Sequence, residues 1–150
     1  APFQRPLPVQ DPQVLPYLNW QQDYTYDIDL QVSLTPVNTK SPLEITRSNF
    51  QYLYWSIHQQ LAHHTVNGCN VRVGDLLASG TISGPEKTSR GCLLELSWRG
   101  AEPLELPGGE KRTFLEDGDR VTMSGWCQGS DYRIGFGEVT AKLLPARKSG

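Results

Sequence analysis

The feature that most limits the possible folds of this chain is an eleven-residue alternation of apolar and polar side chains, YTYDIDLQVSL at residues 24–34. The side chains on its apolar face are Tyr24, Tyr26, Ile28, Leu30, Val32 and Leu34. A period of two residues is typical of a half-buried β-strand. Beyond Val71 the further candidate strands are LLAS, CLLELSW, RTFL, RVTMSGWCQ and YRIGFGEVTAKLL, punctuated by glycine-containing turns. The chain is therefore predicted to be mostly β.

One segment has helical rather than strand spacing. In NFQYLYWSIHQQLAHH, residues 49–64, the apolar side chains recur every three to four residues and form one stripe. Ser48 and Gln51 fit a capping box at the start, and Asn67-Gly68 favours the end of the helix. We therefore expect a mostly β (α+β) protein with one main helix, at about residues 48–64, packed on curled sheets.

The first 19 residues contain five prolines, which favour an extended path along a surface. The chain begins with Ala1, and this opening segment has neither the basic nor the apolar region of a signal peptide. We interpret the chain as an interior piece of a longer protein, and a processed N-terminus is the alternative. Residues 1–19 are expected to form an extended segment and residues 20–150 a globular part.

The composition argues against several classes of partner. Lys plus Arg is 14 and Asp plus Glu is 16, so no basic stripe for nucleic acid and no polybasic membrane patch is expected. The sequence contains no run of about 18 apolar residues, so no transmembrane helix is expected. The three cysteines are widely spaced and form no CxxC motif, which favours small buried side chains in a reducing, cytoplasmic location over disulfides or a zinc site.

Two segments contain candidate functional residues. In GDLLASGTISG, residues 74–84, backbone amides and the Thr81 hydroxyl are suited to a carboxylate ligand, although tight turns use the same residues. In the predicted strand CLLELSW, Glu95 has a leucine on each side, so its carboxylate is expected to be partly buried. From the pattern alone, Glu95 fits a functional carboxylate and a structural pair with an arginine equally well.

The histidines and the DGD string are more ordinary. His58, His63 and His64 lie near the predicted helix, but adjacent residues point about 100° apart and no acidic residue joins them in the sequence. Solvated side chains favoured by the helix dipole are therefore expected rather than a metal site. Asp117-Gly118-Asp119 suggests calcium less strongly than it suggests a hairpin turn.

Several strings, taken together and in order, resemble the fumarylacetoacetase family. They are QDPQVLPYL, YDIDLQVSL, RSNFQYLYW, LAHHTVNGCNVRVGDLLASGTISG, LLELSWRG, RTFLEDGD and YRIGFGE. The resemblance extends from about Pro2 to Pro145, and its longest block is more specific than the GD-x-x-x-x-GT core of the wider superfamily. On this resemblance, residues 20–150 are the C-terminal portion of the catalytic domain.

The resemblance implies a mixed β-sandwich roll, a homodimer, and hydrolysis of the carbon–carbon bond of 4-fumarylacetoacetate to fumarate and acetoacetate, the last step of tyrosine degradation. It also implies a divalent cation, magnesium or calcium, that polarises the diketone oxygens, and a histidine that acts as base on water. By motif, Glu95 would orient that histidine, and Thr81 would bind the substrate at a carboxylate.

The motifs that supply the base histidine, the metal-binding carboxylates and the oxyanion-stabilising side chains in this family do not occur in the chain. We therefore expect the chain to be inactive alone, its metal ligands to lie outside it, and the N-terminal part of the same protein to be its partner around a small-molecule substrate. The alternative is a non-catalytic, β-rich binding or structural module derived from this fold.

Overall fold

A four-stranded antiparallel sheet dominates the computed structural model, which describes residues 2–20 and 23–147. Its strands lie in the order β4-β3-β7-β8 and span Asp29–Thr35 (β3), Leu43–Asn49 (β4), Arg120–Gln128 (β7) and Arg133–Lys142 (β8). Two small antiparallel sheets pair β1 (Gln4–Pro6) with β2 (Tyr24–Tyr26), and β5 (Leu104–Glu105) with β6 (Lys111–Arg112). The prediction of a mostly β chain is confirmed.

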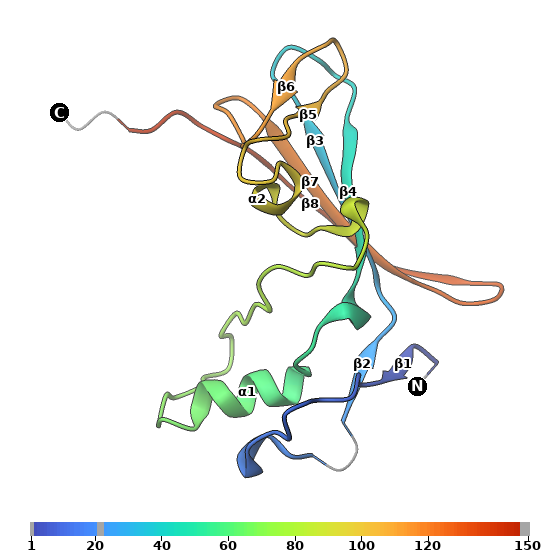
Figure 1. Ribbon diagram of the computed structural model, residues 1–150, viewed down its shortest axis with the longest axis vertical. Helices are drawn as coiled ribbons and strands as arrows, with labels where there is room; N and C mark the ends of the chain where they lie inside the picture. Colours follow the sequence, from blue (N-terminus) through green and yellow to red (C-terminus); the bar gives the residue numbers. More distant parts are fainter. Residues whose placement is uncertain (1, 21–22, 148–150) are drawn as a thin grey trace.

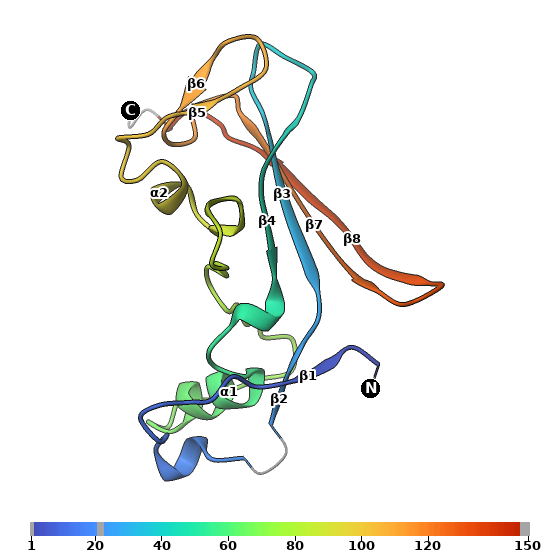
Figure 2. The ribbon, with the colours of Figure 1, turned by 45° about the vertical axis from the view of Figure 1, so that its right-hand side comes forward.

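The molecule is elongated, with the four-stranded sheet at one end and the helix α1 (Ile57–Thr65) at the other (Figure 1). The helix packs against the short 3-10 turn η1 (Pro16–Leu18) rather than on the main sheet, so the expectation that it covers curled sheets is wrong. From α1 the chain runs through residues 66–83, here called the arm, back toward the sheet end (Figures 1 and 2). There it forms the 3-10 turn η3 (Lys87–Ser89) and the short helix α2 (Leu93–Leu96).

The alternating segment 24–34 forms strands but is divided between two sheets. Asp27 and Ile28 lie outside any strand, so β2 pairs with β1 while β3 pairs with β4 and β7. The two later strand predictions are confirmed, because β7 covers RVTMSGWCQ and β8 lies within YRIGFGEVTAKLL. LLAS forms no strand, and RTFL contributes only Arg112 to β6.

The main helix is shorter than the predicted range of about 48–64, because the sequence contains a second capping box. Ser56 accepts a hydrogen bond from the Gln59 amide, and the Gln59 side chain accepts one from the Ser56 amide, each at 3.1 Å. Ser48 lies instead on β4, a strand that the helical stripe concealed, and residues Phe50–Tyr52 form the 3-10 turn η2. The helix ends at Thr65, and Gly68 follows with a φ of +87°, as the Asn67-Gly68 pair predicted.

Few apolar side chains are buried in the described part of the chain. They are Leu18, Leu34, Pro36, Leu96, Leu106, Trp126 and Cys127. The chain exposes 10792 Å² of surface, whereas a compact monomer of 16.8 kDa exposes about 7,600 Å². This open architecture leaves most residues of β8 and of the arm exposed. Within the described residues, no helix is long and apolar enough to span a bilayer.

The three cysteines are free but lie in different environments. Cys127 is buried in β7, and this burial, with the nearby charges of Asp27 and Asp29, raises the pKa of its thiol. Cys92 is half-buried and Cys69 is exposed. The prediction of small buried side chains is therefore confirmed for Cys127 and is wrong for Cys69.

A buried ion pair joins β6 to the turn before β7. The Arg112 Nε donates to Asp119 Oδ2 at 3.1 Å, and its Nη2 donates to Asp119 Oδ1 at 3.2 Å. The Asp119 side chain is fully buried, and the Glu116 amide also donates to it. The DGD string thus forms a structural turn, as predicted. Its second aspartate, Asp119, is paired with Arg112.

We expect Asp119→Asn to lower the free energy of unfolding of the protein by about 3 kcal/mol, because it leaves Arg112 buried with a weakened partner. The matched control is Glu105→Gln, which breaks the exposed Lys111–Glu105 pair and is expected to change stability little. Urea unfolding of the two variants measures the difference. Equal losses in both would contradict the assignment of Asp119 as a buried structural anchor.

Candidate active site

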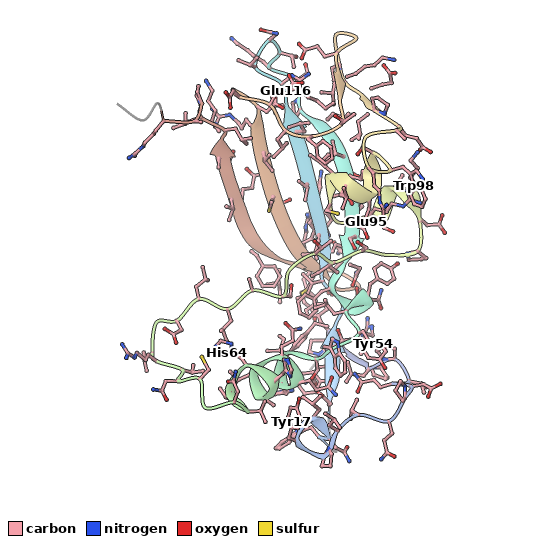
Figure 3. The ribbon with its side chains drawn as sticks, turned by 60° about the vertical axis from the view of Figure 1, so that its left-hand side comes forward. Tyr17, Tyr54, His64, Glu95, Trp98 and Glu116 are labelled. Atoms are coloured by element: carbon pink, nitrogen blue, oxygen red, sulfur yellow. The ribbon has the colours of Figure 1, made fainter. Side chains whose placement is uncertain are left out.

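Thr81 and Glu95, the two site residues predicted from the sequence, line the same groove. The groove has a volume of about 480 Å³, and its walls come from residues 52–55, from Gln60 in α1, from the arm and from α2. Figure 3 shows Glu95 on α2 beside the main sheet, with Tyr54 toward the α1 end. A larger hollow of about 650 Å³, between residues 12–18 and α1, contains neither predicted residue.

Glu95 lies in the short helix α2, not in the predicted strand CLLELSW. Cys92 is extended and precedes the helix, and Ser97 ends it. Trp98 and Arg99 then have φ values of +48° and +58°, a left-handed conformation that no β-strand adopts. The prediction failed because Leu94 is exposed while Leu96 is buried, so the two leucines beside Glu95 do not share an apolar face.

The half-buried Glu95 carboxylate is held by a hydroxyl rather than by an arginine. The Ser83 Oγ donates to Glu95 Oε2 at 2.5 Å. Arg90 contacts the same residue, but its Nη1 donates to the backbone carbonyl oxygen of Glu95 at 3.0 Å. Glu95 takes part in none of the ion pairs formed within residues 2–20 and 23–147. The structural alternative of a Glu–Arg side-chain pair is therefore not what this chain forms.

Thr81 is exposed and lies near the end of the arm, where no strand forms. The close approach of the arm to the segment before α2 depends on Gly91. A Cβ atom at Gly91 would lie 2.6 Å from the Ile82 carbonyl oxygen and 2.8 Å from Thr81 Cγ2, which is too close for any other residue. This contact explains how Thr81 and Glu95, fourteen positions apart in the sequence, reach one groove.

The three histidines have separate partners. His58 Nδ1 lies 3.0 Å from Asp23 Oδ1, His63 Nδ1 lies 3.0 Å from the Tyr17 hydroxyl, and His64 Nε2 lies 3.3 Å from Cys69 Sγ. The sequence reasoning missed Asp23, which is distant along the chain from His58. The helix-dipole argument fits His63 and His64, which lie in the last turn of α1, but not His58, which lies in its first turn.

Within the described ranges, no three His, Cys, Asp or Glu side chains gather closely enough to hold a metal ion. Glu95 has no second carboxylate or imidazole among its hydrogen-bond partners there. The described residues therefore do not by themselves fit the divalent-cation site that the resemblance implies.

The sequence reasoning also missed three features of the groove. Tyr52 and Gln60 line it, but both were assigned to one continuous helix, which would have placed them differently. Ser83 lies in the same GDLLASGTISG segment as Thr81, but nothing in the sequence singled it out. Its pairing with a carboxylate twelve residues away left no signal in the local pattern.

Comparison with known proteins gives a consistent result. The family profile described as fumarylacetoacetate (FAA) hydrolase C-terminal matches residues 11–144. Over 145 residues the chain is 57% identical to a fumarylacetoacetase of Bos taurus, 55% to one of Homo sapiens and 58% to one of Arabidopsis thaliana. These matches cover 97% of the chain but only 34–35% of each relative, so the chain spans about a third of their length. The chain belongs to the fumarylacetoacetate hydrolase family and corresponds to its C-terminal part.

Proposed function

We propose that this chain is the C-terminal part of a hydrolase that cleaves the carbon–carbon bond of 4-fumarylacetoacetate, giving fumarate and acetoacetate. The observation that carries the proposal is the common groove of Thr81 and Glu95, the two residues to which the resemblance assigns substrate binding and orientation of the base. The similarity to three fumarylacetoacetases at 55–58% identity supports the same substrate.

In this proposal Glu95 orients a histidine that removes a proton from water. A carboxylate that accepts a hydrogen bond from imidazole fixes its tautomer and stabilises the imidazolium formed when the proton is taken up. No histidine of the described chain contacts Glu95, so the base comes from outside the chain. The Thr81 hydroxyl, exposed in the same groove, binds a substrate carboxylate as a donor.

The partner in this proposal is the N-terminal part of the same protein. The relatives are almost three times as long as their matched region, and the chain exposes about 3,000 Å² more surface than a compact monomer of its mass. The exposed faces of β8 and the arm offer the surface for such a partner. We further propose that the intact protein is a homodimer and that ligands outside this chain hold magnesium or calcium. We also propose a cytoplasmic location, since the three cysteines are free and the cytosol keeps thiols reduced.

The substitution Thr81→Val in the longer protein tests the substrate-binding role. It keeps the shape of the side chain but removes the donor, so we expect KM for 4-fumarylacetoacetate to rise by about 5- to 150-fold, with kcat changed much less. Thr81→Ser is the matched control, because it keeps the hydroxyl and should retain a KM near that of the parent. The measurement is the loss of substrate absorbance over a range of concentrations.

The outcome that would count against the role of Thr81 is a fall in kcat at constant KM. A KM that rises equally in the valine and serine variants would also contradict it, since the serine variant keeps the hydroxyl donor. An inactive but folded longer protein would refute the proposed reaction itself.

A further inference from the structure

The Ser83 hydroxyl forms a bridge between the arm and the predicted base-orienting carboxylate. Its Oγ accepts a hydrogen bond from the Gly91 amide at 3.0 Å and lies 2.5 Å from Glu95 Oε2. Both contacts lie in a half-buried region, and Ser83 and Glu95 both line the groove. One side chain thus connects the backbone of the segment before α2 to the carboxylate on α2.

The direction of the hydroxyl proton follows from counting donors. A serine hydroxyl has a single proton, and the Gly91 N–H already supplies the proton of its own contact. The Ser83 proton is therefore directed at Glu95 Oε2, which as an ionised carboxylate oxygen can only accept. The contact fixes one oxygen of Glu95 and leaves Oε1 without a hydrogen bond among the described residues.

The backbone around Ser83 is held in place independently of Glu95. The Gly84 amide donates to the carbonyl oxygen of Ser89 at 2.8 Å. A Cβ atom at Gly84 would lie 2.5 Å from Ser89 Oγ and 2.6 Å from the Tyr52 ring, so the chain is closely packed there. Gly91 is equally restricted on the other side of the serine. Ser83 therefore acts as a fixed donor to which the longer Glu95 side chain adjusts.

We propose that Ser83 is a positioning residue of this active site, which holds Glu95 Oε2 so that Oε1 is presented to the histidine base. The inference rests on the proposed function, because it gives Glu95 the base-orienting role. A freely rotating glutamate would spend much of its time in other rotamers, and the bound histidine would then lose its orientation. The effect of Ser83 on the reaction is thus exerted through Glu95.

The test is a double-mutant cycle in the longer protein with Ser83→Ala, Glu95→Gln and the two combined. We expect Ser83→Ala to lower kcat by about 10- to 100-fold while KM changes by less than about threefold. In the Glu95→Gln background the same serine substitution is expected to lower kcat by less than about threefold. The carboxylate through which Ser83 acts has there been replaced by an uncharged amide. Ser83→Thr keeps the hydroxyl and is expected to restore most of kcat.

The melting temperature shows whether a loss of kcat comes from lost positioning or from lost stability of the fold. Ser83→Cys replaces Ser83→Ala in the test if the alanine variant does not fold. The thiol is nearly the same size but a weak donor, so we expect a parent-like melting temperature with a kcat close to that predicted for Ser83→Ala. Parent-like kcat in Ser83→Cys would overturn the inference. Equal losses from Ser83→Ala in the parent and in the Glu95→Gln background would also overturn it, while leaving the proposed function standing. Parent-like kcat in Glu95→Gln alone would remove the base-orienting role and this inference together.

Discussion

Expressed by itself, the 150-residue chain is expected to hydrolyse 4-fumarylacetoacetate at least about 10⁴-fold more slowly than the longer protein. The reason is that the described residues bring no histidine to Glu95 and no three metal-binding side chains together. Without the base of the proposed mechanism no water is activated, and a groove in which Thr81 is exposed does not exclude solvent. The measurement is the loss of substrate absorbance, with magnesium or calcium added.

A complementation experiment provides the control. The proposed N-terminal part, prepared separately and mixed with the chain, is expected to restore a measurable rate, because in the proposed function it supplies the base. Turnover by the chain alone within tenfold of the longer protein would show that it holds its own base. A longer protein that folds and lacks activity would favour the alternative, a β-rich module that binds without catalysis.

The substitution Glu95→Gln in the longer protein is expected to lower kcat by about two to four orders of magnitude and to change KM little. Glutamine keeps the shape and one acceptor oxygen of Glu95 but loses the charge that stabilises the imidazolium. The amide also disturbs the contact with Ser83, whose 2.5 Å distance is typical of a charged acceptor. Steady-state kinetics and the melting temperature, measured on the same preparation, check this expectation.

Glu102→Gln is the matched control for Glu95→Gln. Glu102 lies in the turn that follows α2, is half exposed and pairs with Lys87, so it presents a carboxylate near the site without lining the groove. We expect its kcat and KM to equal those of the parent. A Glu95→Gln variant with a lowered melting temperature and a parent-like kcat would assign Glu95 a structural role and remove it from the mechanism.

The sequence predicted the two long strands β7 and β8 best. β7 and β8 are long neighbours in one sheet, and their residues pair over almost their full length. Residues 24–34 alternate regularly, yet the chain leaves one sheet and enters another at Asp27 and Ile28. An alternating side-chain pattern shows which residues of a segment share a face, but it does not show which other strand pairs with that segment.

The helix boundary and the α2 segment show the limits of local patterns more clearly. The spacing Ser-x-x-Gln occurs at Ser48 and again at Ser56, and pairing of the first with Leu30 in the sheet decides between them. CLLELSW alternates like a strand, but the turn at Trp98 and Arg99 ends it after one helical turn. At Ser48 a contact distant in the sequence overrode the local preference, whereas in CLLELSW the adjacent left-handed turn did so.

The candidate site was predictable in part, because Thr81 and Glu95 lie in recognisable strings. The resemblance named both residues, and the structure places them in one groove. Ser83 could not be assigned from its neighbours, since its role depends on how the arm crosses Gly91.

The pairing of β3 with β7 has a consequence for the order in which the chain can fold during synthesis. Thr35 pairs with Arg120, and every residue of the groove lies between these two positions. The sheet therefore closes a long loop, at an entropic cost on the order of 4 kcal/mol, before its pairing can stabilise the loop. On the ribosome, the arm, Ser83 and α2 emerge ahead of the strand that completes their framework. The groove is thus among the last parts of the chain to acquire a fixed shape, and substitutions that slow the arrival or pairing of β7 would delay assembly of the site without touching it.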